Sequence, residues 1–149
     1  MSKERTPGMS VIVKTVTRLT AWLIMLYGIN IVLHGHVSPG GGFAGGVIIA
    51  LSFIHLILAY GKEMVLSKLS EGLVGVFEST GALIFLGIAL IGMTAGFFFK
   101  NFLPVGEPFH LFSAGTIPLS YIAISLKVWA GLFAIFVALV LLRIDKEQG

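Results

Sequence analysis

Four long apolar stretches dominate the pattern of hydrophobic and polar positions along the chain. A helix needs about 20 residues to cross a hydrocarbon core roughly 30 Å thick, because each residue advances it by about 1.5 Å. The stretches that reach this length lie at about Val11–Leu33, Gly42–Tyr60, Gly72–Phe99 and Leu119–Leu142. The first stretch is too long for the apolar region of a signal peptide, so we expect it to be retained. The pattern predicts an all-α integral membrane protein in which residues 1–149 form a single membrane domain of four transmembrane helices.

The amino-acid composition excludes a soluble globular protein. Hydrophobic residues make up 56% of the chain and charged residues only 11%, and the mean hydropathy is +1.00. Soluble domains carry roughly a quarter charged residues. The chain contains no cysteine, which removes disulfides, thiolate-bound zinc, iron–sulfur clusters and cysteine nucleophiles. No catalytic pair or triad stands out, so we expect neither an enzyme nor a bound cofactor.

The basic residues indicate how the chain is oriented in the membrane. Lys100 falls on one side of the predicted four-helix topology, and Lys127 lies inside the fourth span. The other eight fall on the opposite side: Lys3, Arg5, Lys14, Arg18, Lys62, Lys68, Arg143 and Lys146. Basic residues are enriched on the cytoplasmic side of membrane proteins, so we expect both termini in the cytoplasm and the chain in the cell membrane. The net charge of +3 is thereby a topology signal, and nucleic-acid binding is not expected.

Small residues recur at a spacing that favours close helix packing. Gly42, Gly46 and Ala50 form one smooth ridge on the predicted second helix. Such ridges let a neighbouring backbone approach closely. The whole chain has 19 glycines, and a small four-helix protein can use only part of that surface internally. We therefore expect a multi-subunit assembly.

The connection between the first two spans contains an unusual run, HGHVSPGGGFAGG, over residues 34–46. Its letters include a formal G-x-G-x-x-G, but no strand precedes it and no acidic residue follows for a ribose, so it is not a dinucleotide site. No lysine follows either, which excludes a phosphate-binding P-loop. The glycines permit backbone angles and close contacts that a side chain forbids. We interpret the run as a structural motif formed by His34, His36, Pro39, Gly40, Gly41, Gly42, Gly45 and Gly46.

The letters GHVSPGGGFAGG of this run closely resemble the signature of the B subunit of Mrp-type multi-subunit cation/proton antiporters, the MnhB family. Related subunits occur in archaeal membrane-bound hydrogenases and in a sulfur-reducing relative of them. The resemblance extends to the run FSAGTIPLSYIAISLKVWAGL that enters the fourth span. Some members carry an aspartate near the position of Tyr121, whereas this chain has no acidic residue in its fourth span. The lysine at position 127 resembles the hydrogenase-type subunits more than the subunits of stand-alone antiporters.

The resemblance implies a non-catalytic membrane subunit of a Na+/H+ antiporter module within a redox-driven, hydrogenase-type complex related to respiratory complex I. Its implied partners are other antiporter-type membrane subunits, hydrogenase or sulfur-reductase redox subunits, the transported ions Na+ and H+, and the lipid bilayer. Three alternatives remain open: a purely structural scaffold between membrane subunits, a subunit of a stand-alone Mrp antiporter, and an independent small transporter or metal-binding protein. Four spans without a clear inverted repeat argue against the last.

Apart from Lys14 and Arg18 in the opening turns of the first span, the residues inside the predicted spans that can carry a charge near neutral pH are Glu78, Lys127 and His55. A charge near the bilayer centre costs about 2.5–3.5 kcal/mol on insertion scales, so it normally faces a partner or a wet cavity. One hypothesis makes these residues members of a proton or sodium pathway. The alternative is a structural ion pair, a lysine paired with another subunit's carboxylate, or, for His55, a hydrogen-bonded packing residue.

The outer connections contain a further set of side chains that could bind a metal ion: His34, His36, Glu107 and His110. Their spacing is not diagnostic, because about seventy residues separate the first two histidines from the third, and structural metal sites usually show recognisable ligand pairs. We therefore expect no metal site, and we favour a role for these side chains in holding the glycine loop against neighbouring subunits.

Overall fold

The computed structural model describes residues 9–61, 64–65, 67, 69–107 and 113–148 of the chain. Within these residues, long α-helices account for the architecture. The helices are α1 (Val11–His34), α2 (Gly42–Tyr60), α4 (Glu71–Thr94) and α5 (Ile117–Gln148). All four are long and apolar enough to cross a membrane. The prediction of an all-α membrane protein with four spans is confirmed.

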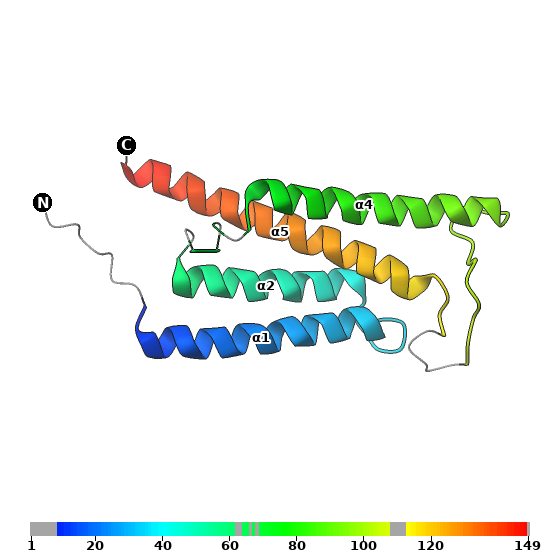
Figure 1. Ribbon diagram of the computed structural model, residues 1–149, viewed down its shortest axis with the longest axis horizontal. Helices are drawn as coiled ribbons and strands as arrows, with labels where there is room; N and C mark the ends of the chain where they lie inside the picture. The colour runs from blue at the N-terminus through cyan, green and yellow to red at the C-terminus, as the bar shows by residue number, and fades with distance from the viewer. Residues whose placement is uncertain (1–8, 62–63, 66, 68, 108–112, 149) are drawn as a thin grey trace, which may run out of the picture.

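The helices pack side by side in the order α1, α2, α5, α4 (Figure 1). Helix α2 therefore contacts α1 on one side and α5 on the other, while α5 also reaches α1 over a short stretch. Along the helix axes, the beginning of α1 and the end of α5 lie at one end of the bundle (Figure 1). Helix α4 ends and helix α5 begins at the opposite end of the bundle (Figure 1). The last helix in sequence thus occupies the interior of the row.

Polar side chains begin two of the helices. The hydroxyl oxygens of Ser10 and Ser70 accept hydrogen bonds from the backbone N–H groups of Val13 and Leu73, at 3.3 and 3.4 Å. Each serine thereby satisfies one of the free N–H groups that every helix start exposes. The first and third spans consequently start within a residue of the positions that hydropathy indicates.

The third span ends five residues earlier than the expected Phe99. Helix α4 stops at Thr94, and Gly96 turns the chain with a φ of 125°, a value that side-chain-bearing residues rarely adopt. The chain then folds back along the helix. A Cβ atom on Gly92 would lie 2.7 Å from the backbone nitrogen of Lys100, so only glycine leaves room for this return. Hydropathy cannot see the reversal because residues 97–99 are phenylalanines.

The fourth helix is longer than expected at both ends, running from Ile117 to Gln148 where we expected about 119–142. Pro118 is its second residue, a position where the missing N–H group costs nothing because no intrahelical acceptor exists there. At the other end the helix continues past the apolar window Ile117–Val140 into a polar sequence. The apolar pattern reports only the part of this helix that can lie in hydrocarbon.

An aromatic cluster fills the core where α2, α4 and α5 meet. Trp129 packs against Phe53 and Phe77 with ring centroids 5.3 and 5.4 Å apart, and Phe133 lies edge-on to Phe53 at 6.0 Å. Phe133 is only 1% exposed. The outer faces of the helices, by contrast, carry many exposed large apolar side chains, such as Leu83 and Leu139. A hydrocarbon environment or partner helices must cover such surfaces.

Candidate functional site

The glycine run forms a tight turn between α1 and α2. After α1 ends, the backbone N–H groups of Val37 and Ser38 both donate to the carbonyl oxygen of His34, at 2.9 Å each. Gly40 and Gly41 then take φ values of 151° and 95°, so glycine is required at both positions. This turn sets α2 antiparallel to α1 and in direct contact with it.

One face of the glycine run holds α2 against α5. A Cβ atom on Gly46 would lie 2.8 Å from the carbonyl oxygen of Ser125, and one on Gly42 would collide with the backbone of Tyr121. Gly42, Gly46 and Ala50 are all buried. The predicted small-residue ridge therefore exists, but its partner is α5 of the same chain.

The opposite face of the run holds α2 against α1. A Cβ atom on Gly45 would lie 2.8 Å from the carbonyl oxygen of Gly28, and would also collide with the side chain of Val32. A Cβ atom on Gly28 would in turn lie 2.8 Å from the side chain of Ile49. Residues 42–46 thus contact two helices at once, and this is a function that the one-dimensional motif does not disclose.

The histidines of the outer connections have local surroundings. The Nδ1 atom of His34 lies 3.1 Å from the carbonyl oxygen of Asn30, one turn back on α1. His36 is half-buried, Glu107 is exposed, and His110 lies outside the described residues. Across the described part of the chain, no group of three or more His, Cys, Asp or Glu side chains is arranged to hold a metal ion.

His55 links α2 to α1. Its Nε2 atom lies 3.4 Å from the hydroxyl oxygen of Thr20, and the imidazole is half-buried. The Thr20 hydroxyl also lies 2.7 Å from the carbonyl oxygen of Val16, to which it can donate its proton. The hydroxyl oxygen then accepts from the Nε2–H tautomer of His55. One turn further along α2, the hydroxyl of Tyr60 donates to the carbonyl oxygen of Lys14 at 3.0 Å.

Lys127 and Glu78 lie on neighbouring turns of the contact between α4 and α5. A Cβ atom on Gly81 would lie 2.8 Å from the backbone nitrogen of Lys127, so the two helices touch there. A Cβ atom on Gly131, one turn further along α5, would lie 3.6 Å from Oε1 of Glu78. The Lys127 side chain is exposed close to the middle of the span Ile117–Val140, and Glu78 is half-buried. No ion pair joins the two side chains in these described helices.

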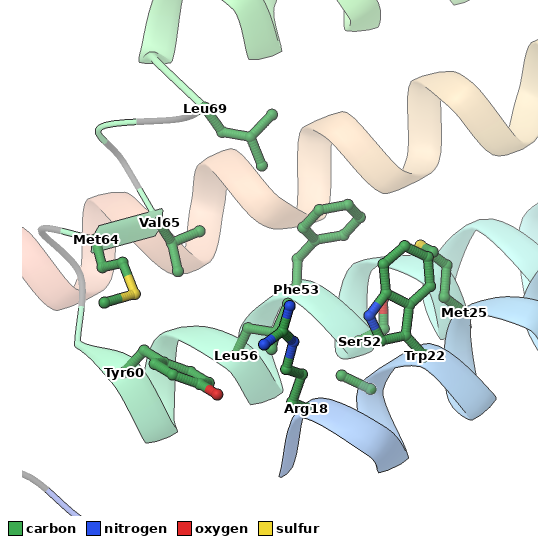
Figure 2. A pocket seen from close by; sticks show the side chains of 11 residues that line it. Arg18, Trp22, Met25, Ser52, Phe53, Leu56, Tyr60, Met64, Val65 and Leu69 are labelled. Atoms are coloured by element: carbon green, nitrogen blue, oxygen red, sulfur yellow. The ribbon is translucent and has the colours of Figure 1, made fainter. Parts of the chain in front are cut away.

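A cavity of about 670 Å³ opens between α1, α2 and the connection that follows α2 (Figure 2). Apolar side chains such as Trp22, Phe53 and Leu56 form most of its wall, and Arg18 supplies its charged group. The cavity lies at the end of the bundle at which α1 begins. It contains none of the residues that the sequence indicated for ion movement.

Sequence reasoning missed the residues on the receiving side of these contacts. The ring of Tyr121 packs on Gly41, at 3.4 Å from the position of a Cβ atom there. Gly28 and Gly81 provide the close approaches of α1 to α2 and of α4 to α5. A single glycine inside an apolar span carries no pairing information, so spacing alone could not have found them. The sequence identifies Arg18 only as one of the basic residues that indicate orientation in the membrane. Its position in a cavity becomes visible only in the folded structure.

Comparison with known proteins points to the same family as the resemblance of the glycine run. Residues 12–134 match the family model described as a domain related to the MnhB subunit of Na+/H+ antiporter. An uncharacterized protein of Methanocaldococcus jannaschii is 39% identical over 120 residues, which are 74% of this chain and 44% of that protein. A putative antiporter subunit mnhB2 of Staphylococcus aureus is 38% identical over 93 residues, 62% of this chain and 63% of that protein.

A solved structure also resembles the fold. A chain of the membrane-bound sulfane sulfur reductase, an archaeal respiratory membrane complex, superposes with a TM-score of 0.73 and 31% sequence identity. The match covers 91% of this chain and 62% of that chain. The protein thus spans less than two thirds of the length of these relatives. The resemblance drawn from the glycine run is confirmed: the chain belongs to the family of domains related to the MnhB subunit of Na+/H+ antiporters.

Proposed function

We propose that this chain is a non-catalytic membrane subunit of a Na+/H+ antiporter module within a redox-driven complex of the hydrogenase or sulfur-reductase type. The family match and the structural similarity to a respiratory membrane complex support this assignment. Other antiporter-type subunits surround the chain in this proposal, and separate redox subunits carry out the electron transfer. The exposed apolar helix faces are the surfaces on which such neighbours and lipid would pack.

The observation that carries a transport role is the position of Lys127. Its side chain is exposed near the middle of an apolar span, where an isolated ammonium group is costly. Because Glu78 does not pair with it, the charge needs a carboxylate from a neighbouring subunit or water in a shared cavity. Both are the usual surroundings of intramembrane charges that belong to an ion pathway.

Glu78 is the second charged residue of the proposed ion pathway. It lies about one helical turn from the level of Lys127 on the same α4–α5 contact. An ammonium and a carboxylate at this spacing can pass a proton through an intervening water molecule, and each alters the electrostatic potential at the other. We assign these two residues to the ion pathway. We assign His55 to packing, because its imidazole is occupied by Thr20 on α1.

Removing either charge tests this assignment. In the assembled complex, Lys127→Ala or Glu78→Gln is expected to slow sodium-dependent proton transport by about 10²-fold, the low end of what a positioned proton-transfer group contributes. Transport is measured in inverted membrane vesicles with a pH-sensitive dye while Na+ is added, and native gel electrophoresis monitors assembly.

Two variants serve as controls for that experiment. Lys100→Ala removes a lysine from the connection between α4 and α5, outside the spans. His55→Gln removes an intramembrane histidine that we assign to packing. Both variants are expected to transport ions at the normal rate. If Lys127→Ala and Glu78→Gln assemble and transport at the normal rate, these residues lie outside the ion path. The chain is then a structural scaffold between the subunits that do move ions.

A further inference from the structure

The cavity between α1 and α2 combines one cation with a long apolar wall. Figure 2 shows the Arg18 side chain extending from α1 into the space bounded by Phe53, Leu56 and Tyr60 of α2. Trp22 and Met25 continue the apolar wall along α1 away from Arg18. Apolar side chains line the cavity on both sides of Arg18. The cavity thus offers one cation beside a long apolar wall, the two features that the headgroup and the hydrocarbon chain of a phospholipid complement.

Arg18 pairs with no anion in the part of the chain that the structure describes. Among the described residues, its guanidinium group has neither a hydrogen-bond partner nor an ion-pair partner, and no acidic side chain lines the cavity. The other polar groups of the wall donate elsewhere: the Ser52 hydroxyl to Ile49 O at 2.7 Å, and the Tyr60 hydroxyl to Lys14 O at 3.0 Å. With respect to residues 9–61, 64–65, 67, 69–107 and 113–148, the five N–H donors of this guanidinium are thus left for a ligand.

The depth of Arg18 suits a lipid headgroup. It lies seven residues after the start of α1, about 10 Å along the helix at 1.5 Å per residue. An arginine at this depth keeps its charged head toward the membrane boundary while its stem lies along apolar surface. Phosphate groups of phospholipids occupy that boundary, and guanidinium groups bind phosphate in a bidentate manner.

We infer that this cavity binds an anionic phospholipid, with its phosphate on Arg18 and one hydrocarbon chain along Trp22, Met25, Phe53 and Leu56. Charge complementarity favours this occupant over a helix of a neighbouring subunit. Such a helix would have to carry a carboxylate at the level of Arg18, whereas every anionic phospholipid carries its phosphate at that level. The inference requires only that the helices span a membrane, so it does not depend on the proposed transport role.

Fluorescence quenching by brominated lipids tests the inference on the full chain. The chain has two tryptophans, so Trp129→Phe leaves Trp22 in the cavity wall as the sole reporter. The protein is placed in bilayers containing brominated phosphatidylglycerol or brominated phosphatidylcholine. We expect Trp22 to report about a fivefold preference for the anionic lipid, the effect of one basic residue near the membrane surface.

Variants of Arg18 identify the source of the preference. Arg18→Gln is expected to remove the preference for the anionic lipid, and Arg18→Lys is expected to keep most of it. Lys100→Gln removes a charge at the opposite end of the bundle and is expected to leave the preference unchanged. Circular dichroism checks that each variant keeps its helix content. Equal quenching by both lipids in the starting protein overturns the inference, and so does a preference that survives Arg18→Gln.

The assembled complex tests the other occupant. Because the chain contains no cysteine, Leu56→Cys places a single attachment point for a photoactivatable crosslinker in the cavity wall. Crosslinks to phospholipid support the inference. Crosslinks exclusively to another subunit contradict it and identify the cavity as a protein interface. Failure of the inference leaves the Lys127 and Glu78 experiment unaffected, because those residues lie on a different helix contact.

Discussion

The missing side chain at Gly46 decides how closely α2 approaches α5. The position of a Cβ atom there lies 2.8 Å from the carbonyl oxygen of Ser125 and 3.0 Å from its Cα atom. Neither backbone atom can move without shifting α5 as a whole. By contrast, a Cβ atom on Gly75 of α4 meets nothing within 4 Å. Two glycines inside apolar helices thus have opposite tolerance for the same added methyl group.

Alanine at these two positions should therefore separate close packing from helix propensity. Gly46→Ala is expected to destabilise the protein by about 1–3 kcal/mol, the usual effect of overpacking. Gly75→Ala is expected to be neutral or to stabilise by up to about 1 kcal/mol, because alanine loses less backbone freedom than glycine in a helix. Thermal unfolding in detergent, followed by circular dichroism, measures both. Equal midpoints for the two variants would contradict the assigned contact.

At the scale of the elements, the aromatic cluster joins α2, α4 and α5 through ring contacts. The indole Nε1 of Trp129 is buried and has no hydrogen-bond partner among the described residues. The ring itself touches Phe53, Phe77 and Phe133. Trp129 therefore stabilises the junction by packing alone, and its N–H group contributes no hydrogen bond.

Substitutions of Trp129 test this division. Trp129→Phe keeps an aromatic ring and loses no hydrogen bond, so we expect it to cost only the packing of the atoms that it removes, and hence less than truncation to alanine. Trp129→Ala empties the junction and is expected to cost about 3–5 kcal/mol. Unfolding midpoints in the same detergent measure the two losses. A loss in Trp129→Phe as large as the loss in Trp129→Ala would contradict stabilisation by packing alone.

The positions of the spans could be predicted from the sequence, because apolar length alone determines which segments can cross a bilayer. The end of the third span could not, since Gly96 reverses a chain that hydropathy reads as continuous through the phenylalanines 97–99. The ridge of Gly42 and Gly46 was predicted, but its partner was not. Whether a small-residue ridge meets a helix of its own chain or of another subunit depends on the order of the helices in space.

At the scale of the whole molecule, the beginning of α1 and the end of α5 lie at the same end of the helix bundle (Figure 1). The excess of basic residues at that end leads us to propose that it faces the cytoplasm. The cysteine-free sequence permits a direct test with single cysteines at Met9, before α1, and at Val105, in the connection from α4 to α5.

Labelling intact cells with a membrane-impermeant maleimide should distinguish the two ends. Met9→Cys is expected to react only after the cells are opened, and Val105→Cys to react from outside. The exposed side chains of both residues make access to the reagent independent of folding motions. The reverse pattern would place the termini outside and invert the proposed orientation.

The central claim is that this chain acts as an accessory subunit of a redox-driven ion-translocating complex. The most direct measurement is to purify an affinity-tagged copy from its native membranes in mild detergent and to identify the co-purifying proteins by mass spectrometry. The proposed function predicts antiporter-type membrane subunits together with nickel–iron or iron–sulfur proteins. Antiporter subunits without redox proteins would instead indicate a stand-alone exchanger. A lone 15.9 kDa chain that still moves ions would contradict the claim.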